Sequence, residues 1–247
     1  MIDIPSLQKT HFIQFNLSDL LDQLGEDFVK QILSSFSCPL NPDVEYFLKT
    51  KAIEMSKRNF SKTYLVYWET EDGIEQEFVG YYALAPKLIF VDPSAVSKRH
   101  KRKLHEYGVY NEKTCQYVAN AILIGQLGKN YENGNDSLIS GSDLLQLAID
   151  KAREVQNLVG GRFIYLECED KPKLLKFYTD NNFTIFGERD LDRDETDKIS
   201  GRYLKQLFAL LYKHSVLVVY NCIAFDGKFR SLPEDTATSL LRICILM

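Results

Sequence analysis

The chain has 247 residues, of which 45% are hydrophobic and 26% charged, and its formal net charge is −4. This composition is typical of a globular protein with a sizeable core, since 14 Tyr and 15 Phe supply bulky apolar surface. The acidic balance excludes a general nucleic-acid binder, because the chain lacks the overall positive field that attracts phosphate backbones.

The five cysteines are widely spaced, and none forms a C-x-x-C pair, which argues against a zinc site and against a disulfide framework. Cys168 and Cys222 lie in apolar runs and are expected in a core. Residues 1–5 lack the pattern of a signal peptide, and no run of about 18 apolar residues could span a membrane. We therefore expect a cytoplasmic protein without a membrane partner.

The first half of the chain begins with a predicted strand and two helices. Residues 10–17 alternate weakly in hydropathy and predict the strand, after which Ser18 is expected to cap a helix that reaches about Phe36. Asn41 followed by Pro42 is typical of a second helix start.

A β-hairpin and a further helix are predicted next. Two runs rich in aromatic and β-branched residues, 63–70 and 77–83, predict strands joined by a turn at residues 71–73. Pro86 is expected to end the second strand, which leaves residues 88–91 as a separate apolar run. A helix is predicted from Ser94 to about Tyr107.

The second half of the chain alternates strands and helices. Residues 118–124 are apolar on both faces, which is typical of a central buried strand. A polar loop at 125–141 precedes the longest predicted helix, from Ser142 to about Leu158, which Gly160 and Gly161 end. The remaining predicted elements are a strand at 162–168, a helix at 172–181, and strands at 183–186 and 203–211. The pattern indicates an α/β fold with a mixed sheet.

The segment Ser140–Asp143 lies directly before the longest helix and has two interpretations. A helix N-terminus presents free N–H groups and a partial positive charge, so Ser140, Gly141 and Ser142 could hold a phosphate. Alternatively, Ser140 and Asp143 match a capping box, which would satisfy the same N–H groups internally. The sequence leaves both open.

The order of these elements, together with three segments, resembles the GNAT superfamily of N-acetyltransferases. The segments are Ile122–Gly128, Gly141–Leu145 and Lys176–Phe183. The resemblance implies a GNAT-like domain over residues 1–212 with an insertion at about 88–113, and it leaves a C-terminal extension at 213–247 without a role. Two positions depart from the family pattern: Gly141 alone remains of the loop glycines, and Asn182 replaces the glycine before Phe183.

The resemblance also implies site residues for acetyl-CoA. Backbone groups of Gln126, Leu127 and Gly128 would hold the pantetheine arm, and Ser140, Gly141 and Ser142 would hold the pyrophosphate. Tyr178 matches the family's general acid, although a core aromatic residue would give the same pattern. A phenol suits that role, because its pKa of about 10 is close to the value of about 8.5 for a thiol.

The general base is not identified from the sequence. Residues 116–128 contain no carboxylate, and Glu167 and Glu169, which share one face of the next strand, are the nearest substitutes. Paired acids at a strand end are also typical of a solvated surface, and a chain of water molecules could serve as the base instead. The scattered histidines give no metal spacing, so no metal is expected.

The resemblance predicts an acyl-CoA-dependent N-acyltransferase that transfers acetyl from acetyl-CoA to a primary amine of a small molecule or protein. The alternative is a catalytically inactive GNAT-fold binding or regulatory module. The basic run 97–103 is interpreted as a solvated helix face rather than a nucleic-acid contact, because the chain as a whole is acidic. The apolar runs 216–223 and 240–247 are expected to pack on the domain or on a second copy, which would make a homodimer.

Overall fold

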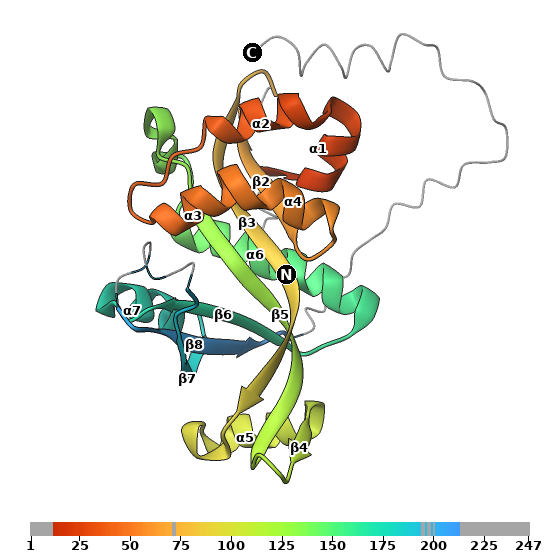
Figure 1. Ribbon diagram of the computed structural model, residues 1–247, viewed down its shortest axis with the longest axis vertical. Coiled ribbons are helices and arrows are strands. Elements are labelled where there is room, and N and C mark those ends of the chain that lie inside the picture. Colours follow the sequence, from red (N-terminus) through yellow and green to blue (C-terminus); the bar gives the residue numbers. More distant parts are fainter. Residues whose placement is uncertain (1–11, 71–72, 194–195, 197–198, 200, 213–247) are drawn as a thin grey trace, which may run out of the picture. The chain divides into compact units, whose positions relative to one another are not determined.

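The protein was analysed as a computed structural model, which describes residues 12–70, 73–193, 196, 199 and 201–212 (Figure 1). Within this part of the chain, eight strands form one sheet in the order β1-β2-β3-β5-β6-β8-β7, with β4 added beside β5. The strands are β1 Phe12–Asn16, β2 Lys62–Glu69, β3 Gln76–Val91, β4 Val109–Asn111, β5 Gln116–Lys129, β6 Phe163–Glu169, β7 Thr184–Asp190 and β8 Tyr203–Leu210. Only β5 and β6 pair in parallel, so the predicted mixed sheet is confirmed.

Helices cover both faces of this sheet. They are α1 Leu17–Leu24, α2 Glu26–Ser34, α3 Pro42–Tyr46, α4 Ala52–Lys57, α5 Lys98–Tyr107, α6 Gly141–Val159 and α7 Pro172–Asp180, with a π-helical turn η1 at Phe47–Lys51 and 3-10 turns η2 at Pro93–Ala95 and η3 at Glu132–Ser137. Figure 1 shows α1 to α4 in front of the sheet, while α6 passes behind β3 and β5. We call the side of α6 and α7 the back face and the opposite side the front face.

Strand alternation assigns the cores to these two faces. Along β6, Ile164 and Leu166 pack with α6 and α7 on the back face, whereas Phe163 and Tyr165 pack with α5. Along β3, Tyr81 belongs to the cluster under α1 to α4 and Ile89 to the cluster under α5. Side chains on a strand alternate between its faces, and these two positions are an even number of residues apart, so they point to the same face. Helices α1 to α4 and helix α5 therefore both cover the front face.

The N-terminal helical region differs from the prediction at two points. The first helix is capped by Asn16, whose Oδ1 accepts a hydrogen bond from the backbone N–H of Ser18 (2.9 Å). It ends at Gly25, whose φ of +78° favours glycine, so the single predicted helix is two, α1 and α2. The second predicted start is confirmed, since Asn41 caps α3 and Pro42 occupies its first turn.

The second hairpin strand also differs, because β3 continues through Pro86 to Val91. The last residue pair between β2 and β3 is Lys62↔Leu84, and beyond it β3 pairs only with β5. A strand bonded on one side tolerates proline, which explains why Pro86 does not end it. The predicted helix begins at Lys98 rather than Ser94, since Ser97 is its N-cap.

In the second half, the predicted order of strands and helices is confirmed, and the boundaries move. β5 runs to Lys129, so the expected loop from residue 125 begins five residues later. The predicted C-terminal runs at 216–223 and 240–247, with Cys222, lie outside the described residues. Cys168 is buried, as expected. No helix in the described ranges is long and apolar enough to cross a membrane.

Candidate functional site

The sheet is open between β5 and β6. Their parallel pairing covers only Ala121↔Phe163, Ile122↔Ile164 and Leu123↔Tyr165. Beyond these pairs β6 pairs with β8 through Glu169, and the rest of β5 pairs with β3. We call the unpaired region between 124–129 and 166–169 the β5–β6 opening. Its backbone N–H and C=O groups can bond an extended ligand, as an exposed strand edge does.

A bulge marks the start of the open part of β5. Ala83 pairs with Gln126 and Leu84 pairs with Ile124, so Gly125 between them has no partner on β3. Gly125 is exposed to solvent. Bulges interrupt a ladder locally and are frequent beside active sites.

The N-terminus of α6 carries the predicted capping box. The Ser140 hydroxyl accepts from the Asp143 N–H (3.0 Å), and the Ser140 N–H donates to Asp143 Oδ2 (3.3 Å). Within the described part of the chain, the N–H groups of Gly141 and Ser142 have no acceptor. The two interpretations of this segment are therefore compatible, because the cap leaves two N–H groups for an anion.

The loop before α6 is held by two polar residues that the sequence analysis missed. The Lys129 ammonium donates to the carbonyl oxygens of Asp136 (2.6 Å) and Ile139 (3.1 Å). Asn130 is 1% exposed; it accepts from the Ser37 N–H (2.9 Å) and donates to the Phe78 carbonyl (2.9 Å). The sequence signal that could have found them is the pair of polar residues at the end of a buried strand. Their bonds tie the loop to the sheet and to the front helices.

Tyr178 lies on α7, on the back face beside the open half of β6. Burial, together with the nearby Cys168 thiol, raises the pKa of the Tyr178 hydroxyl well above its usual value, so it keeps its proton at neutral pH. Among the described residues, the Tyr178 hydroxyl has no hydrogen-bond partner. The neighbouring Phe177 ring would lie 3.6 Å from a Cβ placed on Gly141, so α7 borders the N-terminus of α6.

The turn after α7 explains one departure from the family pattern. Asn182, at the position of the family's glycine, has a φ of +67°. Asparagine is among the residues that adopt this left-handed conformation most readily. The substitution therefore preserves the turn that positions Phe183 and Tyr178 against each other, with ring centroids 5.8 Å apart.

On the front face, the open half of β5 lies directly against α3. A Cβ on Gly128 would lie 2.3 Å from Val44 Cγ1, so only glycine permits this approach. The Gln126 side chain donates to Asp43 Oδ2 (3.2 Å). Leu127, between them, packs on the back face. The three residues predicted to contact the pantetheine arm therefore lie where the strand edge is open.

Glu167 and Glu169 share the front face of β6, and both are ion-paired. Arg189 donates to Glu167 Oε2 from Nε (2.8 Å), and the Tyr165 hydroxyl donates to Oε1. Burial raises the pKa of the Glu167 carboxyl, but the bonds from Arg189 and Tyr165 outweigh it and leave the pKa lowered. Glu169 pairs with Lys171 (2.8 Å). The Glu167 carboxylate is therefore a poor proton acceptor.

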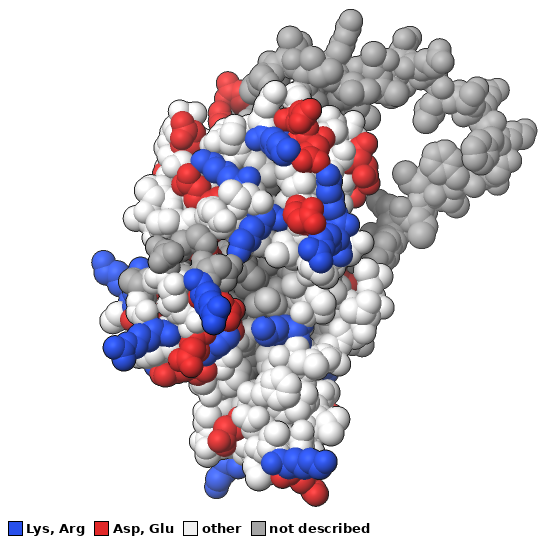
Figure 2. Space-filling model, in the orientation of Figure 1, with Lys and Arg blue, Asp and Glu red and all other residues white. Residues whose placement is uncertain are grey.

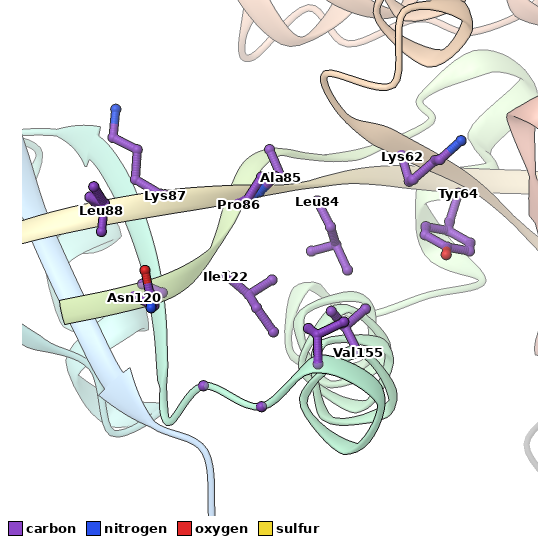
Figure 3. Close-up of a pocket in the computed structure, with 14 residues that line it drawn as sticks. Lys62, Tyr64, Leu84, Ala85, Pro86, Lys87, Leu88, Asn120, Ile122 and Val155 are labelled. Atoms are coloured by element: carbon purple, nitrogen blue, oxygen red, sulfur yellow. The ribbon is translucent and has the colours of Figure 1, made fainter. Parts of the chain in front are cut away.

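A separate cavity of about 480 Å³ lies on the back face near the C-terminal end of α6. Figure 3 shows Leu84, Ile122 and Val155 pointing into it, so its floor is apolar. No predicted site residue lines it. In addition, no group of three or more metal-ligating side chains occurs in the described residues that could hold a metal ion.

The basic run on α5 is an exposed helix face. Lys98, Arg99, Lys101 and Arg102 are exposed, and Leu104 is the buried residue of this helix. Figure 2 shows positive and negative side chains interspersed over the front of the molecule. The described surface in this view therefore carries no broad patch of one sign.

No protein-family model and no curated protein matches this chain in sequence. Solved structures do match in fold. AtaT complexed with acetyl-methionyl-tRNAfMet is 17% identical with a TM-score of 0.51, covering 78% of this chain and 93% of that one. A tyrosine-to-phenylalanine mutant of KacT is 15% identical with a TM-score of 0.53, covering 81% and 95%. AtaT and KacT are GNAT-fold proteins, and this chain shares their fold.

Proposed function

We propose that this chain, which has the GNAT fold, is an acyl-CoA-dependent N-acyltransferase that transfers acetyl from acetyl-CoA to a primary amine. The observation that carries the proposal is the β5–β6 opening. Free N–H groups of Gly141 and Ser142 lie at the start of α6, and the Tyr178 hydroxyl lies beside the open half of β6.

The residues around the opening fit coenzyme A. The pyrophosphate would accept hydrogen bonds from the two free N–H groups of α6, where the helix dipole favours negative charge. The pantetheine arm would lie along the open edge at Gln126, Leu127 and Gly128, which offers backbone donors and acceptors. Asp143 opposes the pyrophosphate charge, but its Oδ2 accepts from the Ser140 hydroxyl (2.6 Å) within the cap.

The chemistry of the proposal follows from where Tyr178 lies. Acetyl-CoA, when bound, supplies an acyl group activated as a thioester. The Tyr178 hydroxyl is protonated at neutral pH, so it has a proton to give to the departing sulfur, although its raised pKa makes it a weaker acid than a solvated phenol. In this proposal the amine would approach the β5–β6 opening from the front face, and the cofactor would lie on the side of α6 and α7.

The acceptor class is proposed from the comparison. The AtaT structure holds an acetylated methionyl-tRNA, so the α-amine of an aminoacyl-tRNA joins small amines and protein amines as a candidate acceptor. The expectation drawn from the net charge therefore applies to general nucleic-acid binding alone, which a net charge of −4 argues against. One aminoacylated tRNA is still a candidate substrate.

The alternative, a GNAT-fold module without catalysis, is favoured by one observation. The two acids nearest the opening on β6, Glu167 and Glu169, are both paired with cations. Such a module would bind coenzyme A or a partner and release no thiol.

Two measurements test the proposal. Calorimetric titration with acetyl-CoA should give a Kd within about 1 μM–1 mM, the usual range for enzyme substrates. Thiol release is then followed with small amines, a lysine peptide and methionyl-tRNA as acceptors. The proposal predicts acceptor-dependent release with at least one of these classes. Absence of binding at millimolar acetyl-CoA would overturn it, and binding without release would support the inactive module.

A further inference from the structure

An N-acyltransferase also needs a group that receives the acceptor's ammonium and takes its proton. Within residues 116–128 there is no carboxylate to do this. Acids on the front face beside the opening include Asp43 on α3 and Glu167 and Glu169 on β6. Their partners decide which of them is available.

Asp43 differs from the other two in its partners. Glu167 is bound by the Arg189 guanidinium, and Glu169 is bound by the Lys171 ammonium. Among the described residues, Asp43 has no cationic partner, and its carboxylate accepts from the neutral amide of Gln126 (3.2 Å). It is partly exposed. A carboxylate without a neighbouring cation is available to bind the ammonium group of a ligand.

The position of Asp43 is fixed by the fold. The Asn41 side chain accepts from the N–H groups of Asp43 (3.2 Å) and Val44 (3.4 Å), which sets the first turn of α3. The buried Tyr81 hydroxyl donates to the Val44 carbonyl (2.6 Å) and anchors that turn to β3. Gln126 is the residue directly after the bulge at Gly125. The carboxylate therefore lies at the point where the open edge of β5 begins.

We propose that Asp43 binds the ammonium group of the acceptor on the front of the β5–β6 opening and accepts its proton before acyl transfer. This inference rests on the proposed function. The ammonium gives one proton to the Asp43 carboxylate, and the freed lone pair forms the C–N bond as the C–S bond breaks. Tyr178 gives its proton to the sulfur, the second proton leaves nitrogen and returns to the Tyr178 phenolate, and the third proton stays on the amide nitrogen.

The test compares Asp43→Asn, Asp43→Glu and the control Asp27→Asn. Asp27 occupies the same position in the first turn of α2, where it is exposed, so it controls for removing a charge at a helix start. In Asp43→Asn, kcat/KM for the acceptor should fall about 100-fold, as expected for losing a general base. The Kd for acetyl-CoA should be unchanged, Asp43→Glu should recover part of the activity, and Asp27→Asn should match the wild type.

A second readout does not depend on turnover. L-Methioninamide, a small ammonium compound, is titrated into the isotope-labelled chain, and the side-chain amide signals of Gln126 are followed. They should shift in the wild type and stay unchanged in Asp43→Asn, because Gln126 donates to Asp43.

The outcomes separate this inference from the proposed function. If Asp43→Asn keeps wild-type turnover, or if the Gln126 signals respond equally in both proteins, Asp43 does not bind the acceptor and the inference is wrong. If the wild type binds no acetyl-CoA, the proposed function fails, and this inference fails with it. If Asp43→Asn loses turnover while Asp27→Asn keeps it, and both variants bind acetyl-CoA, the result supports the proposed function and the role of Asp43.

Discussion

The two halves of β5 have different neighbours. From Tyr117 to Leu123 the strand pairs with β3 on one side. On the other side, 116–118 pair with β4 and 121–123 pair with β6. From Ile124 to Lys129 it pairs with β3 alone. The first half joins the two parts of the sheet, whereas the second half leaves backbone groups free. One strand thus has a fully paired end and an end with one open edge.

The largest expected effect is on stability, at the first half of β5, which we call the closed half because it is paired on both sides. Ile164 is 1% exposed, pairs with Ile122 and packs in the back core, so Ile164→Ala should lower the free energy of unfolding by about 2–5 kcal/mol. Urea unfolding measures this. The control Leu158→Ala, at a position 84% exposed, should change stability by less than about 0.5 kcal/mol. Equal effects of the two variants would show that the closed half does not carry the stability.

The next effect concerns the open half. Tyr178→Phe removes the hydroxyl beside the opening, and thiol release should slow by about 100-fold with little change in the Kd for acetyl-CoA. Stopped assays of thiol release and calorimetry measure the two quantities. Tyr110→Phe, on exposed β4, is the control. Wild-type turnover in Tyr178→Phe would remove this residue from the chemistry.

A smaller effect on stability, which depends on pH, is expected at Glu167 on the β6 side of the opening. Since the pKa of Glu167 is lowered in the folded chain, its contribution to stability is present above the usual carboxyl pKa of about 4.3 and is lost as the pH falls below it. Glu167→Gln should therefore be less stable than the wild type by about 1–3 kcal/mol at neutral pH. Urea unfolding between about pH 7 and pH 3 should show this difference shrinking. A difference that stays constant across this range contradicts the assignment.

The smallest effect is expected at the start of α6. Asp143→Asn removes a negative charge near the proposed pyrophosphate site and should tighten acetyl-CoA binding by about 2–5-fold, equivalent to about 0.3–1 kcal/mol. The gain should diminish with added salt. Asp150→Asn, an exposed position further along α6, should leave the Kd unchanged. Weaker binding in Asp143→Asn would mean that the intact cap matters more than the charge.

How far the sequence predicted the molecule depended on the range of the interactions. The capping box at Ser140 and Asp143 and the helix start at Asn41 were predicted correctly, because each involves residues within three positions. Pro86 was misjudged as a strand end, because whether proline ends a strand depends on which neighbours the strand has. Glu167 gave no sign of its partner Arg189, which lies 22 positions away.

By itself the sequence determined the local elements and their order, since hydropathy period, caps and turn residues act within a few positions. The resemblance of this order, and of three segments, to the GNAT superfamily predicted the GNAT fold, and it implied roles for Gly141 and Tyr178 that stay predictions. Tertiary structure alone decided which carboxylates are paired with cations and where β5 is left unpaired on one side. Asp43 and Gln126 are 83 residues apart, and only the packing of α3 on Gly128 brings them into contact. Such a contact depends on the sum of many distant packing interactions, which no local pattern encodes.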